Sequence, residues 1–169
     1  MEIISNSKST LNQLIDLIKS LKEEEYKNQL SILNNSSIGQ HIRHIIEFYI
    51  EFESGYEIGV ISYDNRKRQL DLETNQELVV STILKTIQNI EKYDLEKPLI
   101  SESNHGLNEK SIKSQTSCRR EIVYALDHTV HHLAIIKIAM QVAFPKITLL
   151  KDLGIAPSTI RNNQKICAQ

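Results

Sequence analysis

Apolar residues at helical spacing constrain the fold of this chain more than any other feature. Between Ser117 and Phe144 the sequence contains no glycine or proline, and its apolar residues recur at steps of three and four. Similar patterns cover residues 8–24, 37–54 and 75–93. The 169 residues include only 5 glycines and 3 prolines, too few turn-forming residues for a many-stranded sandwich or barrel. We therefore predict an all-α fold, a four-helix bundle.

The connections between the predicted helices are unequal in length. Gly55 and Gly59 precede a charged stretch that reads as part of a long crossover. Residues 97–116 are polar and alternate only weakly, which indicates a second crossover that includes at most a short hairpin. Pro145 ends the last long helix, and residues 146–169 then form a short helical strap. Since no linker or repeat divides the sequence, residues 1–169 are expected to form one domain.

The charge and cysteine content exclude several classes of protein. Lysine and arginine total 20 against 21 aspartate and glutamate residues, so the net charge of -1 gives no field for general nucleic-acid binding. Cys118 and Cys167 cannot form a disulfide framework, and the first residues lack the pattern of a signal peptide. No segment approaches the ~20 apolar residues that cross a bilayer. We expect a cytoplasmic protein without a membrane partner.

Five of the six histidines lie in two predicted helices, His41 and His44 in one and His128, His131 and His132 in the other. His128 and His132 are one helical turn apart, so both imidazoles project from one face at a separation that a single cation can bridge. His44 or His41 would add a third nitrogen and leave a coordination position open. The alternative is that each histidine is an ordinary half-buried side chain. Two histidine-rich helices in one chain favour a metal site.

Two motifs resemble the DinB/YfiT-like superfamily. These are residues 37–44, with the sequence SIGQHIRH, and residues 127–132, with the sequence DHTVHH. The resemblance extends along the whole chain in the order and length of the helices. It implies a four-helix bundle, commonly dimeric, that holds a divalent metal on one histidine from the second helix and two from the fourth. By position, these ligands are His44, His128 and His132.

The resemblance also implies a type of chemistry. Characterised members include transferases and isomerases that use low-molecular-weight thiols such as mycothiol or bacillithiol. We therefore expect Zn²⁺ or Ni²⁺ as cofactor, a small-molecule substrate, and the activity of a thiol S-transferase or a related hydrolase, with the catalytic residues unknown. Residues 133–135 are Leu-Ala-Ile where many members have Arg-Gly-Gln, which leaves the substrate open. Whether His41 or His131 joins the site is also open.

Further side chains near these motifs have a functional and an ordinary interpretation. Asp127 could orient a histidine, although a solvated helix face is favoured. Glu47 could act as a base or accept a hydrogen bond from a ligand, although a charge on an exposed helix side needs no special explanation. Tyr124 could line the pocket, although the core is favoured. For Cys118 a buried, inert thiol is favoured over a reactive one.

Arg66 and Arg68 could clamp a carboxylate. Their acidic neighbours Asp64, Asp71 and Glu73 favour an ordinary loop of mixed charge instead.

The C-terminal segment supports an alternative function. Residues 149–161 resemble the turn and the first part of the recognition helix in a helix-turn-helix, with Arg161 placed to contact DNA. In that case the protein would be regulatory and the histidine cluster structural. The small net charge argues against it, so we expect Ile155 and Ile160 to anchor the segment on the bundle or on a second subunit.

Overall fold

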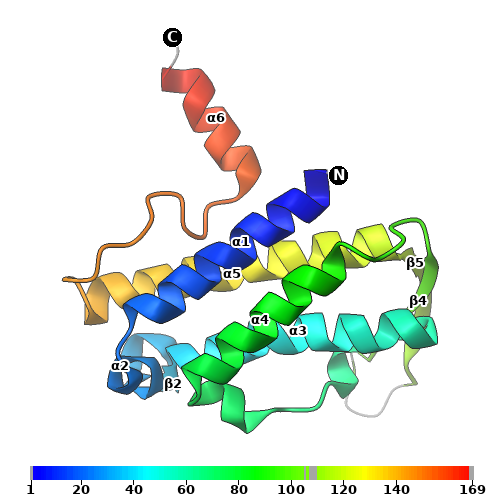
Figure 1. Cartoon of the computed structure of the whole chain (residues 1–169), viewed down its shortest axis with the longest axis horizontal. Coiled ribbons are helices and arrows are strands. Elements are labelled where there is room, and N and C mark those ends of the chain that lie inside the picture. The colour runs from blue at the N-terminus through cyan, green and yellow to red at the C-terminus, as the bar shows by residue number, and fades with distance from the viewer. Residues whose placement is uncertain (1, 105, 107–109, 168–169) are drawn as a thin grey trace.

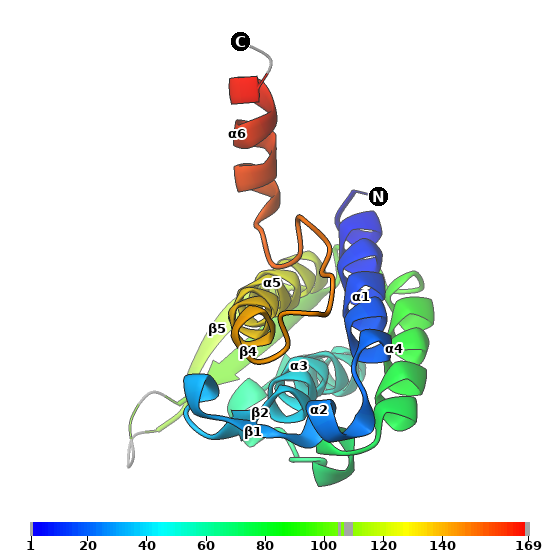
Figure 2. The same ribbon diagram turned by 90° about the vertical axis from the view of Figure 1, so that its left-hand side faces the viewer.

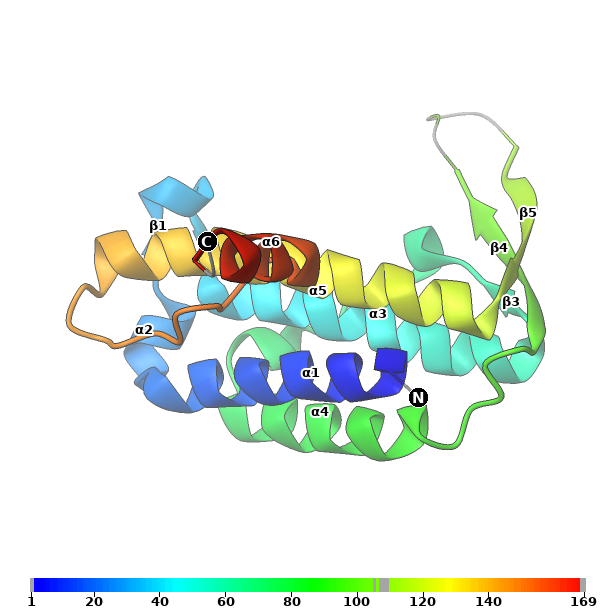
Figure 3. The same ribbon diagram turned by 90° about the horizontal axis from the view of Figure 1, so that it is seen from above.

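The computed structural model of this protein describes residues 2–104, 106 and 110–167. Its four long helices are α1 (Glu2–Ser20), α3 (Ile38–Ile58), α4 (Gln76–Ile90) and α5 (Cys118–Ala143). Each overlaps a predicted helix, although α1 covers residues 2–20 instead of 8–24 and α3 continues to Ile58, four residues beyond the predicted end. Figure 3 shows α1 beside α4 and α3 beside α5, and contacts of α1 with α5 and of α3 with α4 close the four helices into a ring.

The prediction of an all-α four-helix bundle is wrong, because the chain also forms two small sheets. The first pairs β1 (Gln29–Leu30) with β2 (Ser36–Ser37) in antiparallel orientation. The second has the order β3 (Val60–Ile61), β4 (Pro98–Ser103), β5 (Ile112–Ser117), with β3 parallel to β4 and β4 antiparallel to β5. Figure 1 shows this second sheet at the end of the molecule where α3 finishes and α5 begins.

Short elements fill the connections. The short helix α2 (Glu23–Lys27) and a 3-10 turn at Ser31–Leu33 lie between α1 and α3. The long connection between α3 and α4 contains β3 and two further 3-10 turns, Tyr63–Asn65 and Leu70–Glu73. The strands β4 and β5 form a hairpin in the segment where the sequence indicated a crossover with at most a short hairpin. His105 lies outside the described residues.

Local side-chain hydrogen bonds fix where the helices begin and end. The Ser37 hydroxyl accepts from the Gln40 backbone N–H and the Gln40 side-chain oxygen accepts from the Ser37 N–H, which forms a capping box at the start of α3. Gly59, with φ of +89°, ends this helix in the left-handed conformation. At the start of α4 the cap is Asn75, which accepts from the Leu78 N–H.

The core lies between the four helices and extends under the connection from α3 to α4. Its largest fully buried aromatic side chains are Tyr26, Tyr49 and Phe52. The Tyr26 hydroxyl donates to the Leu72 carbonyl oxygen at 2.7 Å, which holds the connection against the bundle. A Cβ added to Gly39 would lie 2.2 Å from the Glu73 carbonyl oxygen, so only glycine permits this close approach.

The C-terminal segment is anchored by residues other than those expected. Leu153 is 1% exposed, and a Cβ on Gly154 would lie 2.4 Å from the Ala134 nitrogen, whereas Ile155 and Ile160 are only half-buried. The helix α6 (Pro157–Cys167) projects away from the other helices (Figure 2). Residues 144–156 separate α5 from α6, a connection longer than the ~3–4-residue turn of a helix-turn-helix. None of the helices in the described ranges has both the length and the apolar composition needed to cross a membrane.

Candidate metal centre

Three histidines from two helices converge on one point. His44 projects from α3, and His128 and His132 project from α5, one turn apart. A ligand nitrogen from each ring lies within 4.8 Å of those of the other two, and the ring centroids are 4.5 to 4.9 Å apart. These are the three residues predicted as ligands, and the structure brings them together by packing α3 against α5. A single cation fits this spacing.

The environment of His128 provides the observation that best fits a metal. Its Nε2 is buried and has no hydrogen-bond partner among the described residues. Its ring stacks on Phe48, with the centroids 3.8 Å apart and the planes at 13°. A buried polar nitrogen without a partner costs free energy, and coordination of a metal would satisfy it. Phe48 lies one turn after His44 on the same side of α3, and it packs against the face of the His128 imidazole.

His41 contacts a ligand and is not in the ligand group. Its Nδ1 lies 3.2 Å from Nδ1 of His132, so one nitrogen donates a hydrogen bond to the other. This contact leaves Nε2 of His132 for a metal, and it makes His41 a positioning residue. His131 is exposed, with its ring centroid 5.5 Å from that of His132.

Arg66 contacts His44, the predicted ligand on α3, and nothing in the sequence indicated this contact. Its Nη2 lies 3.2 Å from His44 Nδ1 and donates to it. A neutral His44 bound to a metal through Nε2 carries its proton on Nδ1, and binding through Nδ1 would occupy the same lone pair. Metal coordination by His44 therefore excludes this hydrogen bond, and Arg66 must turn aside when a metal binds.

Glu47 holds Arg66 in this position. The interpretation of Glu47 as an exposed helix charge is wrong, because the residue is 1% exposed and covered by the connection from α3 to α4. Its carboxylate oxygens lie 3.3 Å from Arg43 Nε and 3.4 Å from Arg66 Nε, and Oε1 accepts from the Gln69 N–H at 2.8 Å. Arg43 also forms an ion pair with Glu73. The carboxylate thus joins α3 to the loop beside the histidines.

The electrostatics of the centre keep its imidazoles neutral. Burial lowers the pKa of His44 to about 4, and the neighbouring His132 and Arg66 act in the same direction. Burial and a neighbouring histidine also lower the pKa of His128 to about 4 and that of His132 to about 3. A metal binds the neutral imidazole, so no proton has to be displaced from these ligands at pH 7.

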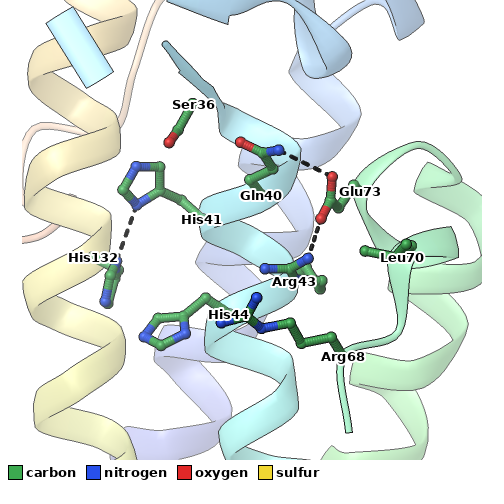
Figure 4. A pocket seen from close by; sticks show the side chains of 9 residues that line it. All are labelled: Ser36, Gln40, His41, Arg43, His44, Arg68, Leu70, Glu73 and His132. Carbon is green, nitrogen blue, oxygen red and sulfur yellow. Dashed lines mark hydrogen bonds and ion pairs between the residues drawn. The ribbon is translucent and has the colours of Figure 1, made fainter. Parts of the chain in front are cut away.

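A pocket of about 530 Å³ opens beside the histidines. Two of the three ligands contribute to its wall, and Figure 4 shows the side chains that surround it. Its lining residues are Ser36, Gln40, His41, Arg43, His44, Arg68, Leu70, Glu73 and His132. The volume lies in the usual range for a small-molecule site, and most of the lining side chains are polar.

The other sequence candidates lie outside this pocket. Asp127 is exposed, as favoured. Tyr124 is 37% exposed, so the favoured placement in the core is wrong. Cys118 is buried, as favoured, and burial raises the pKa of its thiol to about 11. Phe48 was not singled out from the sequence, although it follows His44 by one helical turn.

Comparisons with known proteins provide limited context. No family model matches the sequence, and no solved structure matches it. The chain is similar to FK506-binding protein 5 from Rhizopus delemar, with 29% identity over 113 residues. This similarity covers 64% of the chain and 29% of the fungal protein, so the chain spans less than a third of that relative's length.

Proposed function

We propose that this protein binds a divalent transition metal through His44, His128 and His132. The observation that carries the proposal is the convergence of three neutral imidazoles around the buried, unpartnered Nε2 of His128. Imidazole ligands suit Zn²⁺ and Ni²⁺, and we propose one of these as the cofactor. Membership in the DinB/YfiT-like superfamily is part of the proposal and rests on the two histidine motifs.

The chemistry proposed is that of a thiol S-transferase or a related hydrolase. A metal on three imidazoles keeps a coordination position open and lowers the pKa of a water or thiol placed there. The chain's own residues supply the rest: His41 orients His132, Phe48 shields His128, and the pocket admits a small molecule. We further propose that the protein is a homodimer. We propose the cytoplasm as its compartment, because the buried thiol of Cys118 needs no disulfide partner there.

Metal analysis of protein purified without an affinity tag tests the metal site. After reconstitution with Zn²⁺ or Ni²⁺ at neutral pH, we expect one ion per chain. The His128→Ala variant should lose it, whereas His131→Ala, which removes an exposed histidine of the same helix, should keep it. Absence of metal from the wild type, or equal loss in both variants, would reject the three-histidine site.

The catalytic part needs a separate assay. The metal-loaded protein is incubated with a panel of low-molecular-weight thiols and electrophiles, and thiol consumption is followed. We expect turnover that disappears in His132→Ala. If the panel is silent, the transferase proposal fails and a binding or sensory role remains for the metal site.

A further inference from the structure

Among the residues that the structure describes, one positively charged side chain in the pocket beside the histidines has no acidic partner. Arg43 is paired with Glu47 and Glu73, and Arg66 is paired with Glu47. Arg68 lines the pocket and is exposed, and it forms no hydrogen bond or ion pair with any residue that the structure describes. The structure thereby separates two neighbouring arginines that the sequence presents as equivalent.

The acidic residues near Arg68 in the sequence either have other partners or lie outside the pocket. Asp64 accepts a hydrogen bond from the Asn104 N–H at 2.8 Å, on the side of the hairpin. Glu73 lies in the pocket, but Arg43 and the Gln40 amide occupy its two oxygens. Asp71 is exposed and does not line the pocket. None of these three acidic residues pairs with Arg68 in the part of the chain that the structure describes.

The direction of the Arg68 side chain indicates what its positive charge could bind. In Figure 4, Arg68 extends from its loop toward His44, across the pocket from Gln40 and His41. A small molecule that places one donor atom at the histidines can therefore bring a second polar group to the guanidinium. Guanidinium groups bind carboxylates through paired, charge-assisted hydrogen bonds.

We propose that Arg68 is a specificity-determining residue that binds a carboxylate of the substrate while the substrate's donor atom faces His44 and His132. The substrate class is then a small thiol that carries a carboxylate. This inference rests on the proposed function, since it assumes a metal at the three histidines.

A matched pair of thiols tests the inference by binding. The probes are 3-mercaptopropionate and 3-mercaptopropanol, which share a thiol and a chain length and differ in the carboxylate. Their dissociation constants for the Zn²⁺-loaded protein are measured by calorimetry. We expect the wild type to prefer the carboxylate by roughly tenfold, the size of one partly exposed charge-assisted hydrogen-bond pair.

Variants at two adjacent positions supply the control. Arg68→Gln should remove the preference, whereas Lys67→Gln, which removes the same charge from an exposed residue outside the pocket, should keep it. Equal affinity of the wild type for both thiols, or an unchanged preference in Arg68→Gln, would overturn the inference and leave the metal site intact. If Zn²⁺ binds and neither thiol does, the thiol chemistry and this inference both fail, and if Zn²⁺ itself does not bind, the proposed metal site fails first.

Discussion

Replacement of Glu47 by glutamine removes a buried charge with little change in shape. The residue is 1% exposed and contacts both Arg43 and Arg66. In Glu47→Gln the amide oxygen can still accept from the Gln69 N–H, so the hydrogen bond to the loop is retained. Arg43 keeps its second partner, Glu73. The substitution therefore leaves one arginine, Arg66, without a carboxylate.

The expected cost follows from the burial of that arginine. Loss of one partner from a fully buried ion pair costs about 3–5 kcal/mol, because the remaining charge is uncompensated. The Arg66 side chain is 19% exposed, so water screens part of this charge. We expect a loss of roughly 2–3 kcal/mol in the free energy of unfolding, which with an m-value of ~2 kcal/mol/M lowers the urea midpoint by about 1–1.5 M.

The assay is urea unfolding of metal-free protein, with Glu24→Gln as the matched control. Glu24 is exposed on the short helix α2, and its variant should stay within about 0.5 kcal/mol of the wild type. The double variant Glu47→Gln/Arg66→Gln should recover part of the loss, because it also removes the unpaired charge. A cost below about 0.5 kcal/mol for Glu47→Gln, or a double variant as unstable as the sum of the singles, would refute the reasoning.

Three further predictions concern other parts of the molecule. Gly39→Ala should lower the unfolding free energy by about 2–3 kcal/mol in urea, because its Cβ would overlap the Glu73 carbonyl oxygen, and an unchanged midpoint would show that the connection moves freely. The metal-free protein should lose stability as the pH falls from ~6.5 toward 4, because the unfolded chain then protonates histidines whose pKa values are about 4, 4 and 3 in the folded state. His132→Gln should flatten this pH dependence and His131→Gln should not, so equal slopes in urea unfolding would contradict it. Deletion of residues 157–169 should leave the urea midpoint unchanged. Deletion of residues 151–169 should lower the free energy of unfolding by at least ~2 kcal/mol, because it removes the buried Leu153. Equal losses in the two deletions would mean that α6 packs on the fold.

The sequence predicted the helices well and the strands poorly, for a physical reason. Each long helix buries a continuous stripe, so its period is visible in the residues. The strands β1, β2 and β3 contain two residues each, and β5 is largely exposed, so none of them shows a regular alternation. Their pairing depends on contacts between distant segments, as between Val60 and Ile100.

In the candidate site, too, the contacts within one helix could be predicted from the sequence, whereas the contacts between distant segments could not. His128 and His132 share one helix, so their spacing alone predicts that they lie together. The choice between His44 and His41 depends on how α3 rotates against α5, which the residues alone leave open. The burial of Glu47 depends on a loop that follows it by some twenty positions, and Arg66 and Arg68 differ only in what that loop places beside them.

The anchoring of this loop has a consequence for how the protein could change its ligand during evolution. The Glu47 carboxylate on α3 contacts Arg66 and accepts a hydrogen bond from the Gln69 N–H. The residues on either side of positions 67 and 68 are therefore attached to α3, and these two positions lie in the window between them. Lys67 and Arg68, inside that window, are exposed and support nothing in the core. Substitution of Arg68, which lines the pocket, would alter the pocket without the loss of stability that usually limits new binding specificities. Substitution of position 68 by all other residues is therefore expected to yield folded variants with altered ligand preference.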